Sequence, residues 1–524
     1  MKRLLCLLVA CATPGHPEDD VDYAFARTAD GALAVTLDAP GDPSGTTTLS
    51  FGDPWGGIDH PETGVRSVTI DGQPIAAVNG KWVAHTGKRI HVVYELAPTP
   101  EATKQGSEPF HRPVVSPHLV HLIGTTGVMR PEHLANAKHA VTFRWQIPGW
   151  TGVSSYGDGE VTHAVGTLDE LRDAVFLASD RLDVRRVAIG KTVLEVAAVN
   201  DFGFTDAQLA AKAQQVVTAQ RAFFREDGPP FFLITAIPLG PKGVQYGGTG
   251  LTNSFAIFVA PQFDDLASVT WLLGHELFHS WNGRVIQPDA PEELMYWFSE
   301  GFTNFYARRL LYRAGLVDLA GYVANLNEEV QEYWLSPVRD APNQAIKDGF
   351  WKSHDLERLP YQRGDVLALV LDRQLPGGLD PLMKQLVAEG RAGKTVSIDK
   401  LFARIPRSLR PTVVDGTLPA LPSTLLAPCL ALGAKQVGKF ELGFDLQASQ
   451  AAKSITGLVP GSAAERAGLR EGDAVQGWSI YFNKPEVPVE ITTGGKHITY
   501  LPQGAPVEVP VFAVADASSC PKLL

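Results

Sequence analysis

The chain has 524 residues, 44% of them hydrophobic, and a formal net charge of −11 at pH 7. This length predicts about three domains, and the apolar content is sufficient for cores of ordinary size. The acidic balance leaves no large basic surface, which argues against nucleic acid as a general partner. No internal stretch reaches the ~20 apolar residues that a membrane-spanning helix needs. The composition therefore predicts a multidomain globular protein.

The first residues have the pattern of an export signal. A basic start is followed by an apolar run from Leu4 to Ala10, then by Cys11 and a polar stretch. The run that ends at Cys11 resembles the lipobox of bacterial lipoproteins, in which the cysteine is lipidated, and plain secretion is the alternative. We expect residues 1–19 to be a signal or lipoprotein segment and linker. We therefore expect export to the cell envelope or periplasm, with membrane contact only through a lipid on Cys11 where that cysteine is lipidated.

Short strand patterns separated by turn residues fill the segment from about residue 20 to residue 200. Residues 32–37 and 89–96 have strand patterns, and the second segment alternates with period two. Another strand pattern begins at Val193, directly after a Gly-Lys turn. We therefore expect an N-terminal all-β domain over residues 20–200.

Helical and strand patterns mix in the next segment. Residues 206–226 have the pattern of a helix that Thr205 caps. Residues 231–237 and 254–259 have strand patterns, and residues 243–250 form a glycine-rich loop between them. Further helical patterns continue to about residue 432. We expect one mixed domain over residues 201–432.

This domain contains the pattern H-E-x-x-H at His275, Glu276 and His279. A helix that begins at Asp264 or Asp265 and ends near Gly283 would place both histidines on one face, within reach of one ion. Imidazole suits Zn²⁺, and a catalytic zinc takes three protein ligands and leaves a fourth position for water. The histidines therefore predict one more ligand further along the chain.

Glu300 is the candidate for that third ligand. It lies in an aromatic run with a helical pattern, which begins near Pro291 and ends near Gly315. An uncompensated carboxylate would be costly to bury there, and a metal would compensate it. Glu276 lies beside the histidines and is free to act on a bound water. The alternative interpretation is a pair of core histidines with a surface glutamate.

The C-terminal segment, residues 437–516, resembles a bacterial PDZ domain. The resemblance rests on the loop Leu442, Gly443 and Phe444 and on the run from Pro460 to Asp473. In such domains the loop offers backbone N–H groups to a peptide carboxylate, beside a strand edge that accepts the peptide. The segment either binds a peptide C-terminus or only packs on the enzyme.

Cys429 and Cys520 lie on either side of this C-terminal segment. In an oxidising compartment the two thiols could form a disulfide, although their spacing alone does not establish the pair.

Together these motifs resemble metallopeptidase family sixty-one, the glycyl aminopeptidases. These are gluzincins with an N-terminal β-domain, a thermolysin-like catalytic domain and a C-terminal PDZ domain, which implies a multidomain α+β fold. The resemblance covers nearly the whole chain, and five matching motifs follow the family's order: residues 275–282, 297–303, 313–316, 361–364 and 414–417. The catalytic part is also similar to the family of aminopeptidase N and leukotriene hydrolase. The PDZ-like segment favours the first family.

The resemblance implies the roles of individual residues. His275, His279 and Glu300 would hold one zinc ion per chain, and Glu276 would be the general base. Tyr361 matches the family's tyrosine, whose phenol would donate to the oxyanion of the tetrahedral intermediate.

One departure from the family pattern concerns the substrate. Such families usually place a glutamate on the strand beside the zinc, where it binds the free α-amino group, and Gly250 stands at that place here. The backbone of the segment can still bind an extended peptide. The substrate-binding residues predicted on this basis are Gly247, Gly248, Thr249 and Gly250. Three functions remain open: an aminopeptidase of the glycyl type, an endopeptidase with little preference for a free N-terminus, and a non-catalytic peptide-binding PDZ protein.

Overall fold

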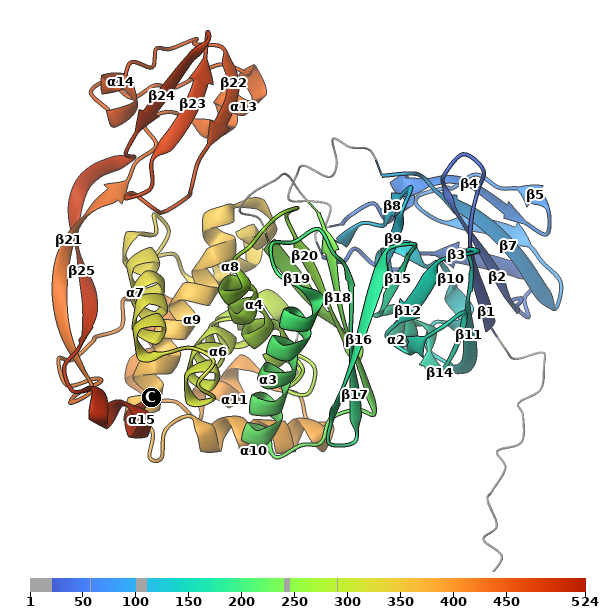
Figure 1. Ribbon diagram of the computed structural model, residues 1–524, viewed down its shortest axis with the longest axis horizontal. Coiled ribbons are helices and arrows are strands. Elements are labelled where there is room, and N and C mark those ends of the chain that lie inside the picture. The colour runs from blue at the N-terminus through green and yellow to red at the C-terminus, as the bar shows by residue number, and fades with distance from the viewer. Residues whose placement is uncertain (1–20, 57, 100–110, 240–245, 290) are drawn as a thin grey trace, which may run out of the picture. The chain divides into compact units, whose positions relative to one another are not determined.

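The computed structural model describes residues 21–56, 58–99, 111–239, 246–289 and 291–524 (Figure 1). The chain divides into two compact units, one up to Leu277 and the other from Phe278 onward. The predicted signal segment with Cys11 lies outside the described residues. Within the described ranges, none of the helices combines the length and the apolar character needed to cross a bilayer.

The N-terminal part of the first unit consists of three sheets. A seven-stranded sheet has the order β14-β11-β1-β2-β7-β4-β5, a three-stranded sheet has the order β10-β3-β6, and a five-stranded sheet has the order β13-β12-β15-β9-β8. The strands are β1 (Val21–Arg27), β2 (Leu33–Pro40), β3 (Thr46–Ser50), β4 (Val65–Ile70), β5 (Gln73–Pro74), β6 (Trp82–His85), β7 (Arg89–Leu96), β8 (Val114–Ser116), β9 (Leu119–Ile123), β10 (Arg130–Pro131), β11 (Lys138–Gln146), β12 (Thr151–Ser154), β13 (Gly157–Asp158), β14 (Val161–Thr167) and β15 (Val175–Ser179). The two strands predicted at residues 32–37 and 89–96 are confirmed as β2 and β7.

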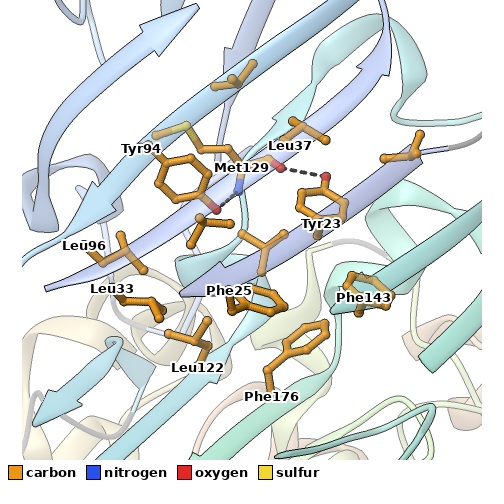
Figure 2. Close-up of a cluster of buried hydrophobic side chains, with 14 of the residues drawn as sticks. Tyr23, Phe25, Leu33, Leu37, Tyr94, Leu96, Leu122, Met129, Phe143 and Phe176 are labelled. Carbon is orange, nitrogen blue, oxygen red and sulfur yellow. Dashed lines mark hydrogen bonds between the residues drawn. The ribbon is translucent and has the colours of Figure 1, made fainter. Parts of the chain in front are cut away.

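Alternate residues of these strands form the core of the N-terminal sheets (Figure 2). Strand β2 alternates buried and partly exposed residues along its whole length, as the period-two pattern requires. Two buried tyrosines also use their hydroxyl groups. Tyr23 donates to the carbonyl of Met129 at 2.8 Å, and Tyr94 donates to the carbonyl of Gly127 at 3.0 Å. Both phenols are thus paired inside the core, as buried polar groups must be.

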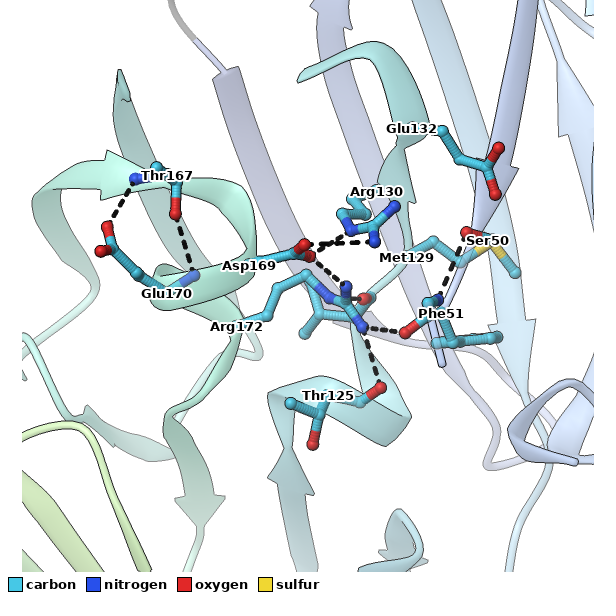
Figure 3. Close-up of polar contacts among 12 residues, drawn as sticks. Ser50, Phe51, Thr125, Met129, Arg130, Glu132, Thr167, Asp169, Glu170 and Arg172 are labelled. Carbon is cyan, nitrogen blue, oxygen red and sulfur yellow. Dashed lines mark hydrogen bonds and ion pairs between the residues drawn. The ribbon is translucent and has the colours of Figure 1, made fainter. Parts of the chain in front are cut away.

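A buried arginine joins several loops of the same region (Figure 3). Arg172 ends the short helix α2 (Leu168–Arg172) and is only 3% exposed. Its guanidinium donates to the carbonyls of Val128 at 2.6 Å and Thr125 at 2.9 Å, and to the carbonyl of Phe51. Burial lowers the pKa of Arg172 to about 10, which leaves the group charged at neutral pH.

A second five-stranded sheet, with the order β16-β17-β18-β20-β19, completes the first unit. Its elements are β16 (Leu182–Ile189), β17 (Thr192–Val199), β18 (Phe231–Pro238), β19 (Tyr246–Leu251) and β20 (Ser254–Val259), with helix α3 (Asp206–Phe224) between β17 and β18. Thr205 caps α3 in a capping box with Gln208, as predicted. We expected a domain boundary at residue 200, but β17 pairs in parallel with β18, so this sheet continues across it. A strand pattern does not reveal which sheet the strand joins, because pairing is non-local.

The glycine-rich segment before β20 is a strand and not the predicted loop. Residues 246–251 form β19, the edge strand, which pairs antiparallel with β20, and residues 243–245 lie outside the described residues. Glycine weakens a strand, so the sequence of this segment did not predict one. Its strand conformation is stabilised by pairing with β20. A Cβ on Gly248 would lie 2.3 Å from the ring of Phe255, so only glycine fits there.

Helix α4 (Leu266–Phe278) follows β20 and ends before Gly283, the predicted end. The second unit then continues with helices. They are η5 (Glu292–Met295), α5 (Tyr296–Ser299), α6 (Gly301–Arg313), α7 (Leu319–Leu335), α8 (Asn343–Gly349), η6 (Phe350–Lys352), α9 (His354–Gln374), α10 (Asp380–Arg391), α11 (Ile398–Phe402) and α12 (Arg410–Val414). The helix expected through Glu300 is divided at that residue. Its turn is nevertheless continuous, because the Glu300 N–H donates to Tyr296 at 2.8 Å and its carbonyl accepts from Asn304 at 2.9 Å.

The C-terminal region of the second unit is built mainly from strands. Strands β21 (Leu430–Phe440) and β25 (Gln503–Val514) form a long antiparallel ribbon, and β22 (Val475–Ser479), β23 (Val489–Thr493) and β24 (Lys496–Tyr500) form a small sheet. The region thus begins before residue 437 and takes in residues assigned to the preceding domain. A disulfide joins Cys429 to Cys520 at one end of the ribbon. Asn327 of α7 binds the backbone of Phe512 in β25 through two hydrogen bonds of 2.8 and 2.7 Å.

The segment after the PDZ-like loop is helical. Gly443 has a φ of +85°, and helix α13 (Leu446–Ala452) begins three residues after it, past Asp445. The Asp445 side chain accepts a hydrogen bond from the N–H of Ala448 at 2.9 Å and so caps this helix. Residues 446–452 are rich in alanine and glutamine, which favour a helix over a strand.

Candidate metal centre and active site

Helix α4 presents the two histidines. Asp265 caps its start by accepting from the N–H of Ser268 at 3.0 Å, which decides between the two predicted caps. Gln220 of α3 donates to the carbonyl of Gly274 at 2.6 Å and holds the turn next to His275. Val269 and Leu273 are fully buried on the core side of α4. The opposite side is left partly exposed.

The three predicted metal ligands come together. One ligand atom from each of His275, His279 and Glu300 can be chosen so that all three atoms lie within 4.8 Å of one another. Nε2 of His279 lies 3.2 Å from Oε2 of Glu300. Each of the three residues is partly exposed, so an ion and a substrate can both reach the group.

The donor atoms fit a zinc ion. His279 Nδ1 lies 2.9 Å from the carbonyl of Asn282, and a carbonyl can only accept, so Nδ1 carries the proton and the lone pair of the neutral ring lies on Nε2. Metal-ligating histidines commonly make this kind of bond with their second nitrogen. Tetrahedral zinc with bonds of about 2.0–2.1 Å separates neighbouring ligand atoms by roughly 3.3 Å, which matches the His279–Glu300 distance. Two imidazoles and one carboxylate are thus a ligand set typical of a catalytic zinc site, in which water would take the fourth position.

Asn282 is part of this site, although sequence reasoning gave it no role. The residue is fully buried. The two hydrogens of its Nδ2 are shared among three acceptors, the carbonyls of Phe298 at 3.0 Å and Ser299 at 3.1 Å and Oγ1 of Thr303 at 3.2 Å. These three acceptors lie on either side of Glu300 in the sequence. The one signal in the sequence that could have identified Asn282 is its position three residues after His279, within the family-like motif.

Tyr361 lies on α9, against the turn that carries Glu300. The two helical segments meet at glycines: a Cβ on Gly301 would lie 2.2 Å from Cα of Gly364, and one on Gly364 would lie 1.8 Å from the carbonyl oxygen of Trp297. No side chain fits between the backbones. Two of the family-like motifs, around residues 300 and 361, are therefore in direct backbone contact.

The surroundings of Tyr361 are charged. The guanidinium of Arg358 lies over the Tyr361 ring, 5.3 Å from its centre, and pairs with Glu332 at 3.5 Å. Partial burial lowers the pKa of Arg358, but the carboxylates of Glu329 and Glu332 outweigh this effect and raise it overall. Tyr361 therefore has a permanent cation against its ring.

Strand β19 runs beside the catalytic turn of α4. A Cβ on Gly250 would lie 3.7 Å from the carbonyl oxygen of Glu276, an ordinary contact distance, and Gly250 has no positive φ. The predicted substrate residues from Gly247 to Gly250 are all partly exposed. The structure thus places this strand, which lacks the family's glutamate, next to the candidate base.

Comparison with solved structures shows the fold. An aminopeptidase N family protein from Idiomarina loihiensis matches with a TM-score of 0.72 at 15% identity, over 96% of this chain and 100% of that chain. An M1 zinc metallopeptidase from Deinococcus radiodurans, a variant bound to a Tyr-Ser-Ala substrate, matches with a TM-score of 0.50 at 16% identity, over 77% of this chain and 94% of that chain. No match was found among the curated proteins.

The fold and the three-ligand group define a zinc metallopeptidase of the gluzincin type. Residues 268–352 match the family model described as M61 glycyl aminopeptidase. This segment contains both histidines, Glu276 and Glu300, and ends before Tyr361. The match therefore covers the metal centre and leaves the tyrosine and the substrate strand outside.

Proposed function

We propose that the protein is a zinc-dependent aminopeptidase of the glycyl aminopeptidase type, which acts on peptides. The observation that carries this proposal is the His275, His279 and Glu300 group on an M1-like fold. Bound there, zinc would polarise the peptide carbonyl and lower the pKa of a water molecule toward about 7.

Two side chains of this chain would perform the proton transfers and charge stabilisation. Glu276, next to His275 on the partly exposed side of α4, takes the proton of the attacking water and passes it to the leaving amine. The Tyr361 phenol donates a hydrogen bond to the oxyanion, which develops only as the carbonyl is attacked. The backbone contact between Gly301 and Gly364 supports this role, because it fixes α9 against the Glu300 turn.

The peptide would bind along β19. This is the edge strand of its sheet, and the backbone of an edge strand can pair with an extended peptide. Gly250 supplies no carboxylate for the α-amino group, and this observation favours the second candidate function, an endopeptidase with little preference for a free N-terminus.

The test is metal analysis combined with kinetics. Purified protein is expected to contain about one zinc per chain. His279→Ala should lose most of the metal, whereas Glu276→Gln should keep the metal and lose activity, because only the base is removed. A matched pair of peptides, one free and one N-acetylated, separates the two candidate functions by kcat/KM. A fully active protein without metal would refute the proposal.

We also propose that the C-terminal region is a PDZ-like module. Its small core includes Phe444, Ile455, Leu469 and Ile491, and the Tyr500 hydroxyl donates to the carbonyl of Leu442 at 2.6 Å. The module would hold a peptide carboxylate through the Leu442–Phe444 loop or only pack on the enzyme. Fluorescence anisotropy with peptides that differ only in C-terminal amidation decides between these two roles.

Export is our third proposal. The Cys429–Cys520 disulfide supports it, because such bonds persist in oxidising compartments. Mass spectrometry of membrane fractions should find a mature chain that begins at a lipidated Cys11. A cytosolic chain with an intact Met1 would contradict it.

A further inference from the structure

Asn282 contacts the surroundings of two metal ligands at once. Its backbone carbonyl accepts the Nδ1 proton of His279 at 2.9 Å, while its side-chain amide binds the turn around Glu300. One residue thus holds a ligand of the α4 motif and the turn of the third ligand. We propose that Asn282 is a positioning residue that locks Glu300 onto the α4 histidines. The proposal rests on the zinc site of the proposed function.

The orientation of the amide follows from its partners. Two of the three acceptors are the backbone carbonyls of Phe298 and Ser299, which cannot donate, so the nitrogen must face them. The third acceptor, Thr303 Oγ1, itself donates to the Ser299 carbonyl at 2.5 Å and completes a small closed network. Two carbonyls directly before Glu300 are therefore fixed from the side of α4.

The other amide atom argues against a simple packing role. Oδ1 of Asn282 is buried and has no hydrogen-bond partner among the described residues. An unpaired buried oxygen costs stability, which an apolar side chain of the same size would not. The hydrogen bonds that the Asn282 N–H groups donate therefore explain this asparagine better than packing does. They hold the turn of Glu300, whose Oε2 lies 3.2 Å from His279 Nε2.

The first experiment measures zinc affinity, which needs no turnover. Removal of a group that orients a metal ligand typically weakens metal binding 10- to 100-fold. Asn282→Ala should show a loss of about this size in a competition titration of the apo protein with a chromophoric chelator. Asn282→Asp keeps the size but turns an oxygen toward the two carbonyls, so it should lose at least as much.

The matched control is Asn343→Ala. Asn343 is also buried, at 5% exposure, and donates a single hydrogen bond of 2.9 Å to the carbonyl of Leu294. Its removal should lower the melting temperature and leave the zinc affinity within about 2-fold, well below the change expected for an orienting group. Thermal unfolding of each apo variant verifies that it is folded before titration.

A double-mutant cycle with Glu300→Ala shows whether Asn282 acts through Glu300. If it does, adding Asn282→Ala to Glu300→Ala should weaken zinc binding by no more than about 3-fold beyond the single change. A full additional 10- to 100-fold loss, or wild-type affinity in Asn282→Ala, would overturn the proposal. A protein that binds zinc and cleaves no peptide would refute the proposed function and leave this inference standing.

Discussion

Gly364→Ala tests how the helix of Tyr361 is held against the turn of Glu300. A Cβ at this position would lie 1.8 Å from the Trp297 carbonyl oxygen and 2.8 Å from Cα of Gly301. Both neighbours are backbone atoms, so no rotation of a side chain can relieve the clash. An ordinary carbon–oxygen contact of roughly 3.0–3.4 Å requires the two segments to move apart by more than about 1 Å.

This movement should affect stability and catalysis together. Overpacking of a close-packed interior typically costs about 1–3 kcal/mol, and the gain of up to ~1 kcal/mol from the helix propensity of alanine does not offset it fully. Misplacement of a catalytic group by about 1 Å can lower the rate by roughly 10²-fold. We therefore expect Gly364→Ala to unfold at lower denaturant concentration and to lose most of its kcat.

Gly321→Ala is the matched control. Gly321 lies within α7, and the nearest atom to its Cβ would be Cγ1 of Val317 at 2.8 Å, the end of a side chain that can rotate. Alanine there should leave kcat unchanged and keep or raise the stability. Urea unfolding and steady-state kinetics on both variants are the assays. Wild-type stability and kcat in Gly364→Ala would refute the argument that this glycine contact positions Tyr361.

Three further predictions concern single groups. Tyr361→Phe should lower kcat about 10²-fold or more with little change in KM, measured by steady-state kinetics, because only an oxyanion donor is lost. Replacing Cys429 and Cys520 by serine removes a cross-link between positions 91 residues apart, and should lower the free energy of unfolding by up to about 4–5 kcal/mol in denaturant titrations. Gly250→Glu should raise the preference for free over acetylated peptides by roughly 10- to 150-fold in kcat/KM, since the site has room for a side chain and a charge-assisted contact is worth ~1.5–3 kcal/mol. Gly250→Gln, which lacks the charge, should not raise it.

Features with local signals could be predicted from the sequence. Strand β7 spans the predicted residues 89–96, and the Thr205 capping box starts α3 where expected. The α4 histidines were predictable because helical periodicity alone puts positions 275 and 279 on one face. Each of these conclusions depends on residues within about one or two turns of each other.

Features that depend on residues far apart in the sequence could not be predicted from it. Strand β19 is half glycine, which weakens a strand, and pairing with β20 stabilises it. The sheet that continues across residue 200 was not predictable for the same reason, since β17 pairs across a helix with β18. The resemblance to a PDZ domain gave no expectation for residues 446–452, and their alanine and glutamine content is what favours helix α13 there.

The candidate site also has one part that local sequence predicts and one part that it does not. All three ligands lie between residues 275 and 300, and one asparagine between them binds both the second histidine and the turn of the glutamate. The metal centre is therefore nearly complete within a short piece of chain, which explains why spacing predicted it and why the family match covers it. The helix that carries Tyr361 packs against the Glu300 turn through close backbone contacts of Gly364 with Trp297 and Gly301, and glycine carries no chemistry that a motif search can find. What distinguishes this enzyme from its relatives should lie in such contacts and in β19, rather than in its ligands.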